Sequence, residues 1–202
     1  MSITRPVGGA VTTTGAPPAA RVQPRDHELT FGAEEIIVSK TDTRGVITYA
    51  NDVFVRVCGY SERELIGAPH NLIRHPDFPA GVFKLLWDTI TRGQEIFAYV
   101  KNMARDGSYY WVLAHVTPTY DGRGRIVGYH SSRRCPERAA VAEVDALYDV
   151  MRAEERRHRH RKEAAEASLA LVAGVLADKG VTYEEFVWDL IRRTSGPQGD
   201  GS

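Results

Sequence analysis

Two tight-turn signals divide the second half of the chain into three runs that must pair as consecutive antiparallel strands. Asp106-Gly107 has the residue types of a two-residue hairpin turn, and residues 121–124 repeat the pattern as Asp-Gly-Arg-Gly. Runs rich in β-branched and aromatic residues flank both turns, at 96–102, 109–119 and 125–133. Because turns this short join neighbouring antiparallel strands, this half of the chain predicts a three-stranded antiparallel meander.

An earlier hairpin and a set of helical signals precede these strands. Residues 35–50 contain two strand-like runs around a turn at 42–45. Asn51 and Ser61 can each cap a short helix, and residues 79–91 carry apolar side chains at helical spacing. The order of two strands, several helices and three strands predicts an α+β fold, a five-stranded antiparallel sheet with short helices on one face.

A long helix or a helical hairpin is predicted from residue 136. Val141, Val144, Tyr148 and Met151 follow a spacing of three and four, and the same frame reaches Leu176 across a polar middle. Two amphipathic helices that share this frame by accident explain the spacing equally well. Thr182 to Glu185 is a capping box that opens a last short helix.

Domain boundaries follow from these patterns. We expect a folded domain at 28–135, a helical region for signalling or dimerisation at 136–193, and disordered segments at 1–27 and 194–202.

Composition excludes several classes of protein. Acidic and basic residues number 26 each, so net charge favours no nucleic-acid partner. The longest run of small and apolar residues, 167–177, is about half the ~20 residues that a membrane span needs. The N-terminus lacks a secretory signal, and Cys58 and Cys135 have no metal-ligand spacing. We expect a cytoplasmic protein with reduced thiols and no membrane insertion.

The densest polar cluster lies in a predicted loop at 70–79. It contains His70, Asn71, Arg74, His75 and Asp77 between two helices. These residue types can bind a polar heterocycle or a phosphate, since arginine supplies a rigid fork of donors. A loop held by its own side-chain-to-backbone hydrogen bonds is the alternative interpretation.

Several segments around this cluster resemble a PAS domain. The resemblance is carried by Ala50-Asn51-Asp52-Val53-Phe54, Cys58-Gly59-Tyr60, Glu64-Leu65-Ile66-Gly67 and Pro69-His70-Asn71. The run from His70 to Asp77 is similar to the PAS domain of bacterial aerotaxis receptors, as are Val100-Lys101-Asn102, Asp106-Gly107 and Tyr110-Trp111-Val112. The resemblance covers residues 30–137, and it implies a pocket with non-covalently bound FAD whose redox state reports oxygen.

The resemblance also implies site residues. Arg74, His75 and Asp77 match residues needed for FAD binding. Six further residues match positions expected to line or support the pocket: Asn51, His70, Asn71, Trp87, Asn102 and Tyr110. We therefore expect the side chains at 74, 75 and 77 to point into one cavity. The family commonly has tryptophan where this chain has Ile96, and isoleucine cannot stack on a flavin.

The expected function is a cytoplasmic sensor rather than an enzyme, since no Ser-His-Asp, nucleotide-binding Gly-loop or HExxH pattern occurs. The membrane anchor and methyl-accepting hairpin of the receptors are missing, so we expect a signal that passes to a separate chemoreceptor, kinase or similar protein. From the C-terminal helices we expect a homodimer. A cofactor-free dimerisation or adaptor module is the alternative.

Two other ligand chemistries follow from single residue types. A haem could be bound through one of His70, His75, His115 and His130. A light-driven thiol adduct is not expected, because no cysteine lies between Cys58 and Cys135. The basic run 152–162 is expected to be a solvated helix face, although it could contact nucleic acid or an acidic partner.

Overall fold

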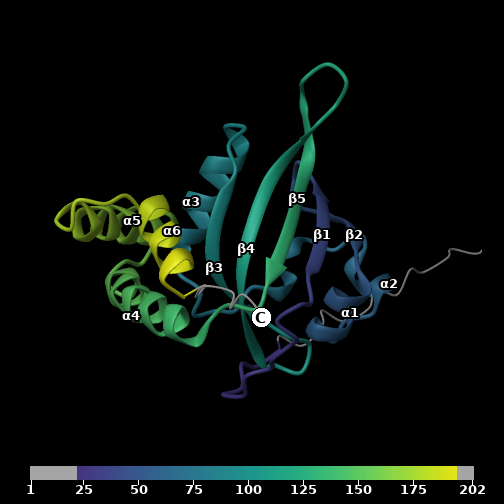
Figure 1. The fold of residues 1–202 in the computed structure, drawn as a ribbon, viewed down its shortest axis with the longest axis horizontal. Helices are drawn as coiled ribbons and strands as arrows, with labels where there is room; N and C mark the ends of the chain where they lie inside the picture. The colour runs from purple at the N-terminus through teal and green to yellow at the C-terminus, as the bar shows by residue number, and fades with distance from the viewer. Residues whose placement is uncertain (1–21, 195–202) are drawn as a thin grey trace, which may run out of the picture.

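Five antiparallel strands form one sheet in the order β2-β1-β5-β4-β3 (Figure 1), which confirms the expected α+β class. The computed structural model describes residues 22–194. Of the expected disordered segments 1–27 and 194–202, residues 1–21 and 195–202 lie outside this range. The strands are β1 (Ile37–Asp42), β2 (Ile47–Ala50), β3 (Ile96–Met103), β4 (Tyr109–Tyr120) and β5 (Ile126–Arg134). Both turn signals of the meander lie where the sequence places them, since Gly107 and Gly124 have positive φ at the two hairpin ends.

Alternation along β3 gives the sheet two different faces. Ala98, Val100 and Asn102 face the short helices, whereas Tyr99 and Trp111, from β3 and β4, belong to a separate core on the other side. Period-two alternation normally leaves one face of an antiparallel sheet to solvent. Here both faces are covered over β3 and β4.

The inner face is covered by four short helices that precede β3. They are α1 (Asp52–Cys58), α2 (Glu62–Leu65), the 3-10 helix η1 (His70–Ile73) and α3 (Ala80–Thr91). Asn51 caps α1 by accepting a hydrogen bond from the N–H of Phe54 at 3.0 Å. Ser61 and Glu64 form the predicted capping box of α2. Between them these helices hold the inner core beneath the sheet.

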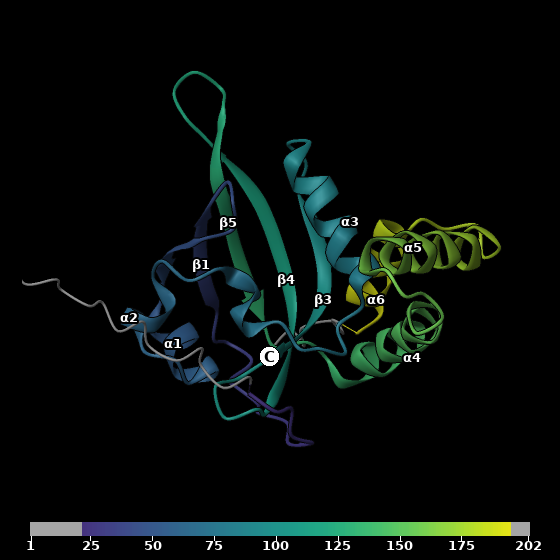
Figure 2. The same cartoon turned by 180° about the vertical axis from the view of Figure 1, so that it is seen from behind.

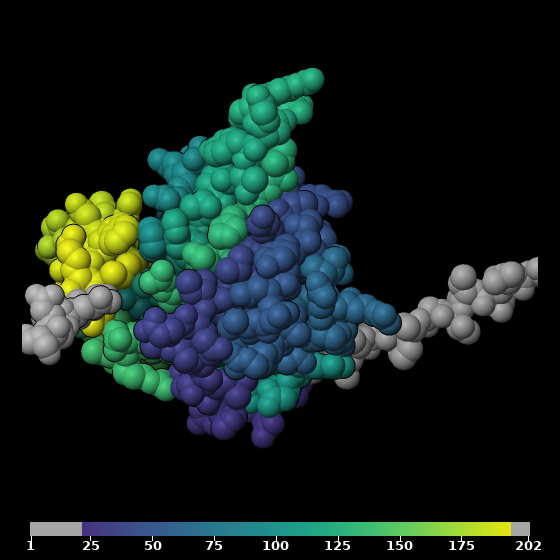
Figure 3. Space-filling model, turned by 45° about the vertical axis from the view of Figure 1, so that its right-hand side comes forward, coloured from purple at the N-terminus to yellow at the C-terminus, as the bar shows by residue number. Residues whose placement is uncertain are grey.

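The outer face is covered by the C-terminal helices. They are α4 (Arg138–Glu155), α5 (Arg161–Ala177) and α6 (Tyr183–Thr194), and they gather at one side of the sheet (Figures 1 and 3). The predicted apolar residues of α4, from Val141 to Met151, are buried. They pack within the chain, against Tyr99 and Trp111, and the Tyr148 hydroxyl donates to the carbonyl of Tyr99 at 2.8 Å. Of the two predicted forms, α4 and α5 therefore adopt the helical hairpin. The apolar side of α4 that was expected to serve dimerisation packs against the sheet instead.

The hairpin breaks within the basic run, at residues 156–160. Arg157 and His158 turn back onto Glu154, each at 2.9 Å. The expectation of one solvated helix face is therefore wrong for this segment, because the helix ends at Glu155 and restarts at Arg161. Within residues 22–194, no helix has the length and apolar character to span a bilayer.

A close crossing joins α5 to α3, which lie side by side in both ribbon views (Figures 1 and 2). A Cβ atom on Gly81 would lie 2.4 Å from the hydroxyl of Ser168, so only glycine permits this approach. Glu155, the last residue of α4, accepts hydrogen bonds from the N–H of Gly81 at 3.0 Å and from the Ser168 hydroxyl at 2.7 Å. One carboxylate oxygen therefore connects three helices.

Order begins earlier than the expected boundary at residue 28. The N–H of Arg25 donates to Gly107 and the carbonyl of His27 accepts from Tyr109, at 2.8 and 2.9 Å. These backbone bonds fasten the segment to the β3–β4 turn. Composition alone missed them because the segment contributes backbone groups rather than apolar side chains.

Candidate functional site

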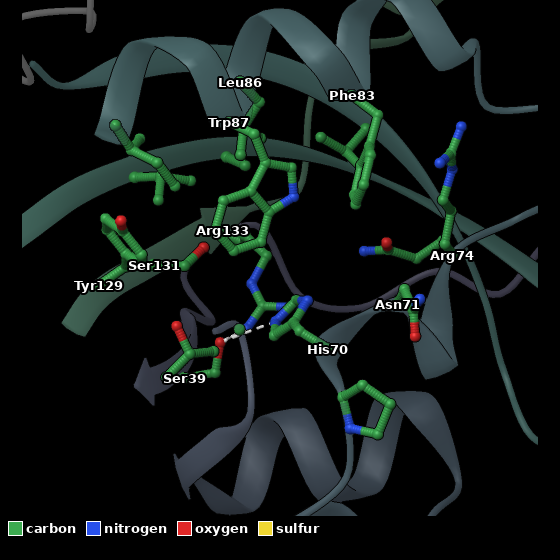
Figure 4. Close-up of a pocket in the computed structure, with 18 of the residues that line it drawn as sticks. Ser39, His70, Asn71, Arg74, Phe83, Leu86, Trp87, Tyr129, Ser131 and Arg133 are labelled. Atoms are coloured by element: carbon green, nitrogen blue, oxygen red, sulfur yellow. Dashed lines mark hydrogen bonds between the residues drawn. The ribbon is translucent and has the colours of Figure 1, made fainter. Parts of the chain in front are cut away.

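A cavity of about 240 Å³ lies between the inner face of the sheet and α3 (Figure 4). Its apolar wall comes from α3, where Phe83, Leu86, Trp87 and Ile90 face the sheet. The opposing strands contribute small residues, including Val100, Ala114, Val116 and Ser131. At these positions the side chains of the sheet are short, and the space between them and the long side chains of α3 stays open.

Trp87 is held against this cavity by the β1–β2 turn. A Cβ atom on Gly45 would lie 2.9 Å from the indole ring, and Gly45 has a φ of +80°. The other side of the indole meets Tyr129 edge-on, with ring centroids 5.6 Å apart. Trp87 therefore presents a fixed aromatic surface to the cavity, as the resemblance predicts for a pocket residue.

An arginine forms the polar end of the cavity. Arg133 is 2% exposed, and one of its terminal nitrogens donates to the hydroxyl of Ser39. Its Nε and its other terminal nitrogen, Nη1, are buried without a hydrogen-bond partner among the described residues. Burial lowers the pKa of Arg133 to about 10, so the group stays charged at neutral pH. Buried donors of this kind are costly unless something accepts from them.

His70 lies beside this arginine. Its Nε2 is 3.1 Å from the Ser39 hydroxyl, which also accepts from Arg133, and Figure 4 shows the three side chains converging. Burial lowers the pKa of His70 to about 3, and the charge of Arg133 acts in the same direction. The imidazole is therefore neutral at physiological pH. A neutral ring can donate or accept at the cavity, whereas a second cation there would repel Arg133.

Arg74, Asn71 and Asn102 line the other end of the cavity. The Arg74 guanidinium lies 4.2 Å from the ring centre of Phe83 and donates to the carbonyl of Phe78 at 2.9 Å. A backbone bridge pairs Arg74 with Asn102. Both asparagines line the cavity, where an amide can donate to a ligand or accept from it.

His75 and Asp77 lie outside this cavity. His75 is buried, and its Nδ1 accepts the N–H of Asp77 at 3.1 Å. The carboxylate of Asp77 is 60% exposed and lies 3.7 Å from the same nitrogen. The expectation that positions 74, 75 and 77 share one cavity is therefore met only by Arg74. The other two shape the turn between η1 and α3.

Two further predicted residues support the cavity from behind. Asn51 bonds the N–H of Val38 at 2.9 Å and the carbonyl of Ile36 at 2.8 Å, which fixes β1 to α1. Tyr110 is fully buried, and its hydroxyl has no partner among the described residues. Burial raises the pKa of Tyr110 far above its usual range. Ile96 belongs to the inner core but does not line the cavity.

Arg133 and Ser39 line the cavity but were not among the residues predicted from the sequence. Both follow period two on the inner face, together with Ser131 and Thr41, which also line the cavity. The sequence pattern that could have identified them is a polar residue at an inward-facing position of a half-buried strand. It could have been found once β1 and β5 were paired, because Ile37 lies opposite Arg133 and fixes its side of the sheet.

Comparison with known proteins agrees with this architecture. Residues 47–133 match a family model described as the PAS fold. The chain contains a PAS domain. The matched residues include α3, β3 and β4, which line the cavity, whereas β1, which supplies Ser39 and Thr41, lies before them. The resemblance inferred from the sequence is therefore confirmed.

Curated relatives of this PAS domain are parts of longer proteins. The chain is 41% identical over 117 residues to the aerotaxis receptor of Escherichia coli strain K12, covering 58% of this chain and 23% of the receptor. It is 32% identical over 99 residues to a nitrogen fixation regulatory protein of Klebsiella pneumoniae, covering 49% of this chain and 20% of that protein. The chain thus spans less than a quarter of the length of either relative.

Among solved structures, the dark structure of the blue-light photoreceptor Aureochrome1 LOV superimposes with a TM-score of 0.50 at 24% identity. The match covers 56% of this chain and 85% of that one. At this identity the likeness shows the fold of the PAS domain alone. The cavity residues of this chain have to be judged by their own chemistry.

Proposed function

We propose that this PAS domain is a sensor whose cavity holds the isoalloxazine ring of FAD without a covalent bond. The observation that carries the proposal is the buried guanidinium of Arg133, which keeps two donor nitrogens unpaired, among the described residues, at the end of an otherwise apolar slot. An apolar slot with few, fixed polar groups is the usual form of a small-molecule pocket. A planar heterocycle with acceptor atoms along one edge matches both features.

The donor set fits a flavin ring. When bound, FAD supplies a ring system that exchanges electrons and protons. In this chain, Trp87 and the apolar side chains of α3 would hold the ring faces, while Arg133 and His70 would donate to its polar edge. Neither Cys58 nor Cys135 lines the cavity, which supports non-covalent binding.

Signal relay through the C-terminal helices completes the proposal. Asn102 lines the cavity on the inner face of β3, and its neighbour in the strand, Lys101, lies on the opposite face. Tyr99 of the same strand bonds Tyr148 of α4. A shift of β3 would therefore reach α4 through one hydrogen bond. The names of the two curated relatives, a receptor and a regulatory protein, support a role in sensing rather than catalysis. The cytoplasmic location and the separate signalling partner stay predictions. Homodimerisation stays a prediction.

The features of the cavity distinguish this proposal from the two alternative functions. A cofactor-free interaction module needs no unpaired donors at Arg133. A haem protein needs a histidine facing the cavity; of the four predicted, His70 alone lines it, and its Nε2 is engaged with Ser39. Both remain outcomes of the test below.

The test uses the full chain and two variants. Purified protein is incubated with FAD, its absorption spectrum is recorded, and released ligand is identified by mass. We expect a flavin spectrum for the parent chain. Arg133→Met should weaken flavin binding at least ~10-fold, because a charge-assisted hydrogen bond is worth about 1.5–3 kcal/mol. Arg123→Met, at the exposed tip of the β4–β5 turn, should bind as the parent does.

The same variant has a second readout that a folding defect cannot imitate. Without ligand, Arg133→Met should raise the free energy of unfolding by about 1–3 kcal/mol, since it removes buried donors that lack partners among the described residues. Equal flavin affinity in Arg133→Met and the parent would contradict the assignment of Arg133. A colourless parent chain that refuses FAD favours the interaction module, and a haem absorption band favours the haem protein.

A further inference from the structure

A second hollow adjoins the cavity and is much larger. This cleft has a volume of about 1220 Å³ and shares Asn71, Arg74 and Phe83 with the cavity. It runs between the turn that precedes α3, the end of β3 and the N-terminal turn of α5. Arg161 and Lys162 line it from α5, so the C-terminal helices form one of its walls. The two hollows are therefore adjacent, with Arg74 between them.

Positive charge dominates this cleft. Five cations line it: Arg74, Lys84, Arg105, Arg161 and Lys162. Two have counterions, since Arg105 pairs with Glu64 at 2.8 Å and Lys84 pairs with Asp88 at 2.6 Å. Within residues 22–194, no carboxylate lies within ion-pair distance of the other three. The acidic residues interleaved with the basic run therefore do not neutralise these three cations.

The electrostatics of Arg74 reflect this crowding. Burial lowers the pKa of Arg74 to about 10, and the charge of Arg161 acts in the same direction, while Glu155 opposes the shift. Like charges gathered in a partly buried groove repel each other unless an anion joins them. The first turn of α5 also favours an anion. Its backbone N–H groups are free because His160 provides no side-chain cap there.

The volumes of the two hollows bear on how a large ligand would be bound. Pockets for drug-sized ligands typically have volumes of about 300–1,000 Å³. A cavity of about 240 Å³ can hold a ring system but not a whole dinucleotide. The two hollows share Asn71, Arg74 and Phe83, so the rest of such a ligand can extend past Arg74 into the cleft.

We propose that the cleft binds the phosphate groups of the ligand whose ring occupies the cavity, and that Arg161 and Lys162 of α5 close on them opposite Arg74. This inference rests on the proposed function. The ligand then bridges the PAS domain and the C-terminal helices. Its presence reaches α5 directly, without passing through the sheet.

The experiment compares two flavins that share a ring system. FAD carries a pyrophosphate, whereas riboflavin carries none. Each is titrated against the full chain, the double variant Arg161→Gln/Lys162→Gln, and the control Arg156→Gln/Arg159→Gln. The control removes the same charge from exposed residues of the same basic run that do not line the cleft. We expect the first variant to lose at least ~10-fold in FAD affinity, with riboflavin affinity unchanged within about twofold.

The control should bind both flavins as the parent does. Hydrogen exchange supplies a second readout, since FAD should slow exchange at the N-terminal turn of α5 and riboflavin should not. Unchanged FAD affinity in Arg161→Gln/Lys162→Gln overturns the cleft assignment while the cavity assignment stands. A parent chain that binds neither flavin overturns the proposed function, and the cleft assignment with it.

Discussion

His70 and Arg133 place two basic side chains at the same end of a cavity, and only one of them is charged. Arg133 keeps its proton because arginine remains basic even when burial lowers its pKa to about 10. His70 loses its proton because burial lowers its pKa to about 3. The Ser39 hydroxyl joins the two. This arrangement makes the fold sensitive to acid in a way that can be measured.

The free energy of unfolding should fall as the pH drops from about 6.5 towards 3. The unfolded chain binds a proton at His70 near its usual pKa of 6.5, whereas the folded chain binds it only near 3. In this window the unfolded state holds more protons, so acid favours unfolding. Urea unfolding at several pH values measures the slope. His70→Asn should reduce it by up to about 1.4 kcal/mol per pH unit.

His160→Asn serves as the control, because His160 is exposed at the start of α5. Its slope should equal that of the parent. His75, whose pKa burial also lowers, contributes to the slope of all three proteins and does not affect the comparison. An unchanged slope in His70→Asn would show that this imidazole takes up its proton as readily in the folded chain as in the unfolded one.

At this scale the sequence predicts some residues of the cavity and not others. His70, Asn71, Arg74, Trp87 and Asn102 line it as expected, because they lie in segments whose pattern is local. Asp77 does not, since its orientation depends on a turn that the sequence leaves open. Arg133 was missed for a related reason. An arginine at the end of a strand usually reaches solvent, and only pairing of β5 with β1 shows that it cannot.

At the scale of elements, the crossing of α3 and α5 depends on one glycine. Gly81→Ala places a Cβ atom 2.4 Å from the Ser168 hydroxyl and 3.0 Å from the backbone nitrogen of Leu169. The helices must separate, and overpacking of this kind costs about 1–3 kcal/mol. We expect this decrease in the free energy of unfolding, measured with urea.

A matched control lies within α5 itself. A Cβ atom on Gly174 would have no neighbouring atom within 4 Å, so Gly174→Ala should stabilise the helix by about 0.5–1 kcal/mol. Opposite signs for the two substitutions would locate the effect at the crossing. A Gly81→Ala variant as stable as the parent would show that α5 does not press on α3 in solution.

The strands could be predicted more completely than the helices. Turn chemistry is local, so Asp106-Gly107 fixes a hairpin without reference to the rest of the chain. The spacing of Val141, Val144 and Tyr148 identifies an apolar side of a helix but not the surface that covers it. In α5 the same frame predicts Leu169 as a core residue, whereas Ser168 is the buried one. The close approach at Gly81 rotates the contact towards the smaller side chain.

For the whole molecule, the C-terminal helices cover apolar surface that would otherwise be exposed. Tyr99 and Trp111 are 1% and 5% exposed on the outer face of the sheet, beneath α4 and α6. A chain that ends at Arg134 uncovers both. Large apolar patches promote association. We expect this shortened chain to form larger particles in light scattering and to bind a hydrophobic dye.

Adding Tyr99→Ser and Trp111→Ser to the shortened chain tests the cause. These changes should restore a single small species if the uncovered outer face drives association. A shortened chain that stays monomeric without them would mean that α4 and α6 contribute little to covering the sheet. In that case the helices would be free to serve an external partner instead.

Glu155 couples the positions of α3, α4 and α5 to one another. A single oxygen accepts from both Gly81 and Ser168, so displacing α4 from either neighbour removes support from the other as well. Packed helix interfaces such as this one have discrete arrangements rather than a continuous range of them. A small movement of α3 at the wall of the cavity would therefore switch α4 and α5 from one packing to another. It would not shift these helices by a proportional amount.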